Sequence, residues 1–127
     1  MTLCDAELKV RMAEVDHLTR AICERLEHEV HKLGFSESER FIASYTEAHC
    51  RLARDPATGR DGLVGVWQDP QGCKCGEFIV HADGSFFAEY DVVRVHPRDP
   101  RWFVEAVTAW GREALIKSEP RLLPISG

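Results

Sequence analysis

Residues 73–91 read CKCGEFIVHADGSFFAEYD, and this stretch predicts two antiparallel strands joined by a tight turn. The strand-forming runs are residues 73–81 and 85–96, and the turn is Ala82-Asp83-Gly84. A loop of this length places its glycine in the left-handed conformation. A three-residue loop is favoured over a two-residue loop because it brings one set of apolar side chains onto a common face. These side chains are Phe78, Val80, Phe86, Ala88 and Tyr90.

The opposite face of the predicted hairpin is chemically mixed. In the same register Glu77 lies opposite Glu89, and Ile79 lies opposite Phe87. Like charges across a ladder are destabilising, so we expect a nearby cation, a basic partner or a raised carboxyl pKa there. Solvent screening of an exposed pair is the alternative. The two large apolar side chains need a cover, which is either the chain's own helices or a partner.

Upstream of the hairpin the sequence has a helical pattern. Apolar residues recur at spacings of three, four and seven over residues 3–33, which predicts a long amphipathic helix that ends at Gly34. A serine–glutamate capping box opens a second helix, residues 36–52, and the short link between the two predicts a helical hairpin. Residues 55–62 then form a polar loop, and residues 63–68 form a short strand.

Downstream of the hairpin we expect a third helix. Asp99 followed by Pro100 is typical of a helix start, and Gly111 is typical of a helix end. Residues 114–118 form a last strand. The sequence therefore predicts one α+β domain over residues 1–127: an N-terminal helical hairpin, then a small antiparallel-rich sheet of three to four strands, with one helix between strands three and four.

The composition narrows the function classes. The formal net charge of −5 argues against nucleic acid as a partner, because phosphate binding needs a basic surface. No apolar run is long enough to span a bilayer, and the N-terminus has no signal-peptide pattern. We therefore expect a soluble cytoplasmic protein without a membrane partner. Its five cysteines would be reduced there.

Three residues of the predicted strand 73–81 are metal-ligand types: Cys73, Cys75 and His81. Cys75 and His81 are too far apart along an extended strand to share one ion unless the strand breaks. Small side chains that fill space are the simpler interpretation. We therefore expect no metal and no cofactor, and a zinc-binding or thiol-redox domain remains an alternative.

Acidic and aromatic side chains supply two further hypotheses. Acid–base groups for a small enzyme or ligand carrier, with a pocket between helices and sheet, would come from Glu77, Glu89, Asp91 and Tyr90. Surface anchors for a partner or ligand would come from Ile79, Phe87, Trp67 and Trp102. Because the chain has none of the familiar nucleotide-binding or hydrolase motifs, the leading hypothesis is a non-enzymatic binding or adaptor module, with a homodimer as one arrangement.

Overall fold

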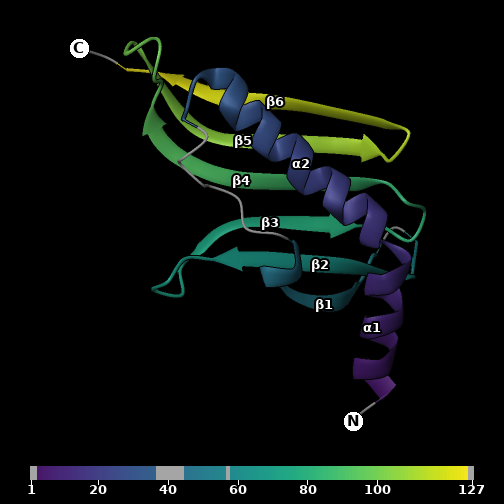
Figure 1. Ribbon diagram of the computed structural model, residues 1–127. Helices are drawn as coiled ribbons and strands as arrows, with labels where there is room; N and C mark the ends of the chain where they lie inside the picture. The colour runs from purple at the N-terminus through teal and green to yellow at the C-terminus, as the bar shows by residue number, and fades with distance from the viewer. Residues whose placement is uncertain (1–2, 37–44, 57, 126–127) are drawn as a thin grey trace.

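The computed structural model describes residues 3–36, 45–56 and 58–125. Two helices, α1 (Leu3–Glu14) and α2 (Asp16–Leu33), precede a short 3-10 helix, η1 (Tyr45–Glu47). Six strands follow: β1 (His49–Arg54), β2 (Asp61–Gln68), β3 (Lys74–Val80), β4 (Phe86–Val95), β5 (Trp102–Arg112) and β6 (Leu115–Pro124). Each strand pairs antiparallel with the next, so the described strands form one sheet in the order β1-β2-β3-β4-β5-β6 (Figure 1).

The predicted fold is wrong in the strand number and the connections of its sheet. The chain is α+β, but the sheet has six strands rather than three to four, and no helix separates strands three and four. The segment predicted as the third helix is β5, which pairs with β4 on one side and β6 on the other. The predicted last strand, residues 114–118, is the first half of β6.

The turn before β5 explains the wrong helix. The carboxylate of Asp99 accepts a hydrogen bond from the backbone N–H of Arg101 at 3.1 Å, and the carbonyl of Asp99 accepts one from the N–H of Trp102 at 3.1 Å. Aspartate followed by proline therefore builds a turn here, since the same side-chain bond serves turns and helix caps. The aromatic and β-branched residues that follow favour a strand.

The predicted helical hairpin is also wrong. The first helix divides at Val15, whose φ of −107° and ψ of 11° lie outside the helical range, into α1 and α2. Of the predicted second helix, residues 37–44 lie outside the described residues. Its end belongs to β1, where Leu52 pairs with Leu63 of β2.

The central hairpin has the predicted register. Phe78 pairs with Ala88, Glu77 with Glu89 and Ile79 with Phe87. Gly84 has a φ of +88°, so the loop has its glycine in the left-handed conformation as expected. This hairpin was predicted well because a slip of one residue would exchange its two faces.

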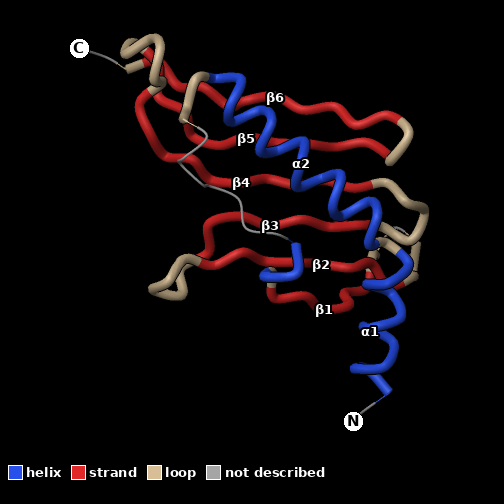
Figure 2. The backbone as a smooth tube through the Cα atoms, viewed as in Figure 1, coloured by secondary structure: helices blue, strands red, loops and turns tan. Residues whose placement is uncertain are grey.

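The core lies between α2 and one face of the sheet, which we call the inner face. α2 crosses this face at an angle to the strands (Figure 2), and Ile22, Leu26 and Val30 are buried beneath it. Each such side chain contributes roughly 2 kcal/mol through burial. Trp67 packs against Phe78 with ring centroids 5.2 Å apart.

A glycine makes room for this aromatic packing. A Cβ placed on Gly65 of β2 would lie 2.3 Å from the ring of Phe78, so no larger residue fits without moving the ring. Because Gly65 has no side chain, the ring of Phe78 can lie close to the backbone of β2.

The other face of the sheet, the outer face, has no helix on it in the part of the chain that the structure describes (Figure 1). The sequence left two covers open for Ile79 and Phe87, the chain's own helices or a partner. Since the segment predicted as the third helix is β5, no helix among the described residues covers them. The exposed side chains of the outer face therefore define the candidate site.

Candidate binding face

A row of apolar side chains crosses the outer face from strand to strand. It is made by direct cross-strand neighbours, each pairing with the next, and we call it the apolar row: Val64, Ile79, Phe87 and Trp110. Arg51 pairs with Val64 at one end, and Lys117 pairs with Trp110 at the other. Phe87 keeps 43% of its surface exposed, and the other three members are partly buried, so the row is accessible in the isolated chain mainly at Phe87.

A second row of cross-strand neighbours lies beside the apolar row, displaced from it by two residues on each strand. We call its polar members the acidic row: Glu77, Glu89, Thr108 and Glu119. The predicted juxtaposition of Glu77 and Glu89 is confirmed by the strand register. Lys74 Nζ lies 2.9 Å from a carboxylate oxygen of Glu77, and Arg121 forms an ion pair with Glu89. These two cations relieve the cross-strand repulsion.

Asp91 lies next to the acidic row on β4. Burial, together with the neighbouring carboxylate of Glu89, raises the pKa of Asp91 above its ordinary range, although Lys74 and Arg121 act in the opposite direction. The desolvation is therefore not fully offset by the local cations. Lys74, Glu77, Glu89 and Asp91 surround a hollow of about 170 Å³.

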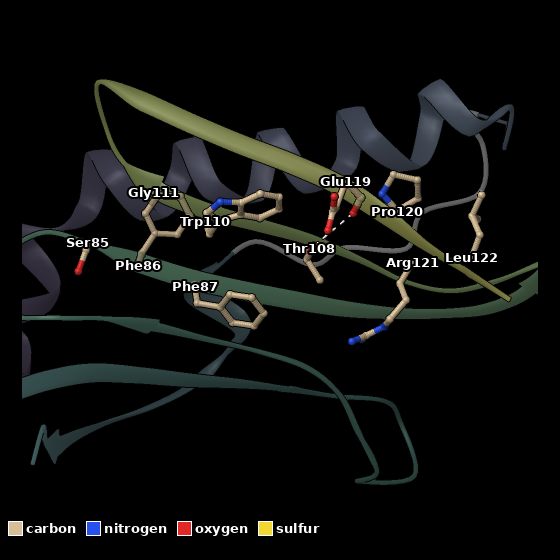
Figure 3. A pocket seen from close by; sticks show the side chains of 10 residues that line it. All are labelled: Ser85, Phe86, Phe87, Thr108, Trp110, Gly111, Glu119, Pro120, Arg121 and Leu122. Carbon is tan, nitrogen blue, oxygen red and sulfur yellow. Dashed lines mark hydrogen bonds between the residues drawn. The ribbon is translucent and has the colours of Figure 1, made fainter. Parts of the chain in front are cut away.

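A larger open groove runs along β4, β5 and β6 and has a volume of about 860 Å³. Figure 3 shows the rings of Phe87 and Trp110 on its wall, with Thr108 between them and Arg121. The Thr108 hydroxyl donates a hydrogen bond to the carbonyl of Glu119 at 3.3 Å, which ties β5 to β6 across the groove. The groove thus combines aromatic surface with charged groups in reach.

The residues predicted as acid–base groups fall on two faces. Glu77, Glu89 and Asp91 belong to the outer face, whereas Tyr90 is buried in the core on the inner face. Burial raises the pKa of Tyr90, and the hydrogen bond from the Cys75 thiol, 3.7 Å away, adds to the rise. Its hydroxyl is therefore protonated at neutral pH and lies apart from the three carboxylates.

The predicted surface anchors divide in the same way. Ile79 and Phe87 are on the outer face, within the apolar row. Trp67 is only 2% exposed and lies in the core, while Trp102 is 36% exposed at the start of β5. The structure brings Ile79 and Phe87 together and leaves both tryptophans outside the apolar row.

The three candidate metal ligands have different surroundings and do not share a site. Cys73 is exposed, Cys75 contacts the Tyr90 hydroxyl, and Nδ1 of His81 lies 3.2 Å from a carboxylate oxygen of Asp55. The carbonyl of His81 accepts a hydrogen bond from Arg11 of α1 at 3.0 Å. Within the described residues, no three histidine, cysteine or acidic side chains gather closely enough to hold a metal ion.

The sequence reasoning missed several residues of this face, chiefly Trp110, Glu119 and Arg121. Trp110 fell within the segment predicted as the third helix, and Glu119 and Arg121 lay beyond the last predicted strand, residues 114–118. The available signal was the density of β-branched and aromatic residues in β5. That signal would have predicted a strand, and hence a partner strand after the turn at residues 113–114.

Neither helix in the described part of the chain has the combined length and apolar character needed to cross a membrane. Comparisons of the chain with protein-family models, with curated proteins and with solved structures give no match. The geometry of the outer face therefore carries the functional argument alone.

Proposed function

We propose that the chain is a non-enzymatic binding module that receives a partner protein on the outer face of its sheet. The observation that supports this proposal is the apolar row, which includes two aromatic rings on a face without a helix in the described residues. Contiguous exposed apolar side chains rimmed by polar ones are typical of interaction sites. Aromatic residues at such places supply much of the binding free energy.

The arrangement of the side chains favours binding over catalysis. Glu77 and Glu89 are engaged by Lys74 and Arg121, and Asp91 lies in a hollow smaller than the roughly 300–1,000 Å³ of small-molecule sites. Glu119 lines the larger groove, which is open to solvent along its length. Tyr90, which would complete an acid–base set, is on the inner face. An extended, shallow groove is better suited to a macromolecule than to an enclosed substrate.

The test is site-specific photo-crosslinking in the cells that make the protein. A photoreactive phenylalanine analogue replaces Phe87 in one variant and Val10 in a control, because Val10 is an apolar residue on α1 with 59% exposure. We expect a discrete product from position 87, and excess unlabelled wild-type protein should compete with it. Excess Phe87→Ser protein should compete far less.

Two outcomes would overturn the proposal. Identical products from positions 87 and 10 would indicate general stickiness rather than a site. A product from position 87 that Phe87→Ser protein removes as well as wild-type protein does would show that the apolar row is not needed for binding.

A further inference from the structure

We propose that the partner segment is a basic amphipathic helix, with its apolar side chains on the apolar row and its lysine or arginine side chains against the acidic row. This inference rests on the proposed function, because it names the chemistry of the partner that the same face would receive. Three observations carry it: the charge of the face, the spacing of its rows, and the poor match of the face to a copy of itself.

Carboxylates outnumber cations around the acidic row. Five carboxylates lie on it or beside it: Glu77, Glu89, Asp91, Glu105 and Glu119. Two cations pair with them, since Lys74 binds Glu77, and Arg121 binds Glu89 and, at 3.3 Å, Glu105. Five negative and two positive charges leave a local charge of −3, and Lys117, exposed two residues from Glu119 on the same face of β6, reduces it to −2. No ion pair in the described part of the chain involves Asp91 or Glu119.

The spacing of the two rows fits a helix. Rows two residues apart along a strand are separated by roughly 7 Å, and a row across four strands is roughly 15 Å long. A helix with its side chains is about 10 Å wide, so one helix covers both rows at once. With a rise of 1.5 Å per residue, about ten helical residues span the apolar row. α2 shows that a helix can pack on this sheet, since it crosses the inner face at an angle to the strands and rests mainly on β5 and β6 (Figure 2).

A second copy of this chain fits the face poorly. In a two-fold dimer the same patch of each subunit faces its counterpart. The acidic row of one chain would then approach the acidic row of the other, with an excess of two negative charges on each. A positively charged partner avoids this repulsion and supplies cations to Asp91 and Glu119, which have no ion pair among the described residues.

Three synthetic peptides test the inference. They share one helical leucine stripe and carry lysine, glutamine or glutamate at the positions beside it. Fluorescence anisotropy gives the affinity of each peptide for the full chain at low and at moderate salt. We expect the lysine peptide to bind most tightly, with an affinity that falls as salt rises, because screening weakens exposed charge pairs.

Matched charge variants locate the contact. The double variant Asp91→Asn with Glu119→Gln removes two carboxylates from the outer face, and Glu7→Gln with Glu24→Gln removes two from exposed positions on the helices. We expect the first variant to weaken binding of the lysine peptide about fivefold or more, and the second to leave it nearly unchanged. Phe87→Ser should weaken binding of all three peptides.

The outcomes separate this inference from the proposed function. Equal binding of the three peptides, lost in Phe87→Ser, would overturn the basic partner and keep the binding face. Equal weakening by the two charge variants would also overturn the basic partner. Tightest binding of the glutamate peptide would reverse the assigned charge. Binding that Phe87→Ser does not weaken, or no binding of any peptide, would count against both the face and the partner chemistry.

Discussion

At the scale of single residues, Asp91 is a carboxylate of the outer face whose surroundings disfavour its ionised form. Its carboxylate is partly desolvated beside Glu89, and no ion pair in the described residues compensates it. An ionised group in that position opposes folding, because desolvation and like charge both disfavour the charged form. A partner that brought a cation would reverse this cost.

The pH dependence of stability follows from the pKa of Asp91. That pKa is raised above its ordinary value of 3.8, so the protonated form favours the fold. This contribution is present below pH 3.8 and is lost as the pH rises through the folded-state pKa. Asp91→Asn should therefore raise the thermal midpoint at pH 7 and leave it nearly unchanged below pH 3.8.

Asp99→Asn serves as the control with the opposite sign. Arg101 lowers the pKa of Asp99 to about 2, so the ionised form favours the fold. This variant should lower the thermal midpoint at pH 7, and the difference should vanish as the pH falls towards 2. Thermal denaturation followed by circular dichroism measures both. A lower midpoint for Asp91→Asn at pH 7 would contradict the account of this carboxylate.

At the scale of elements, a buried polar contact fixes α2 on the sheet. The Ser118 hydroxyl of β6 donates a hydrogen bond to a carboxylate oxygen of Glu29 at 2.9 Å and accepts one from Nε of Arg25 at 2.6 Å. Glu29 is only 5% exposed. A buried carboxylate needs such a donor, so this contact sets where the helix lies across β6.

Removing the hydroxyl tests that contact. Ser118→Ala leaves the Glu29 carboxylate without this donor and should lower the free energy of unfolding by about 1–3 kcal/mol. Ser85→Ala removes a hydroxyl that bonds Asp83 in an exposed turn and should cost about 0.5 kcal/mol or less. Urea unfolding at neutral pH compares them. If Ser118→Ala cost no more than Ser85→Ala, the contact would not position α2.

The elements also show what the sequence can and cannot predict. The β3–β4 hairpin was predictable in register because Asp83-Gly84 fixes the turn and the apolar residues alternate on both sides of it. β5 was not, because a bulge near Glu105 shifts its alternation and leaves Phe103, Ala106, Val107 and Trp110 at helical spacing. Within β5, Val107 faces the core while Trp110 faces outward.

The same limit applies to the candidate site. Ile79, Phe87, Glu77 and Glu89 could be placed together because one hairpin carries them all. Trp110 and Arg121 could not, because their neighbours in the sheet depend on strand pairings that the local pattern does not specify. The local periodicity of a sequence predicts which side chains share a face of one strand or helix. The apolar and acidic rows depend in addition on which strands pair in the folded sheet.

At the scale of the whole molecule, one feature dominates: the described helices gather on a single face of the sheet. An antiparallel sheet tolerates water on one side, but its exposed side is then usually polar. Here that side carries an apolar row next to an acidic row. We propose that this face is open in the isolated chain and available to a different molecule.

Fluorine NMR of protein labelled with fluorotryptophan tests this claim most directly, because the three tryptophans occupy three environments. Trp67 is buried, Trp102 is partly exposed away from the apolar row, and Trp110 lies in it. Phenylalanine substitutions at positions 102 and 110 assign the fluorine resonances. The difference in the fluorine chemical shift of each residue between H₂O and D₂O reports its contact with solvent. We expect a solvent shift for Trp110 that does not change with protein concentration, and none for Trp67. A Trp110 resonance without solvent contact, at all concentrations or only at high ones, would show that the chain itself or a second copy already covers the face.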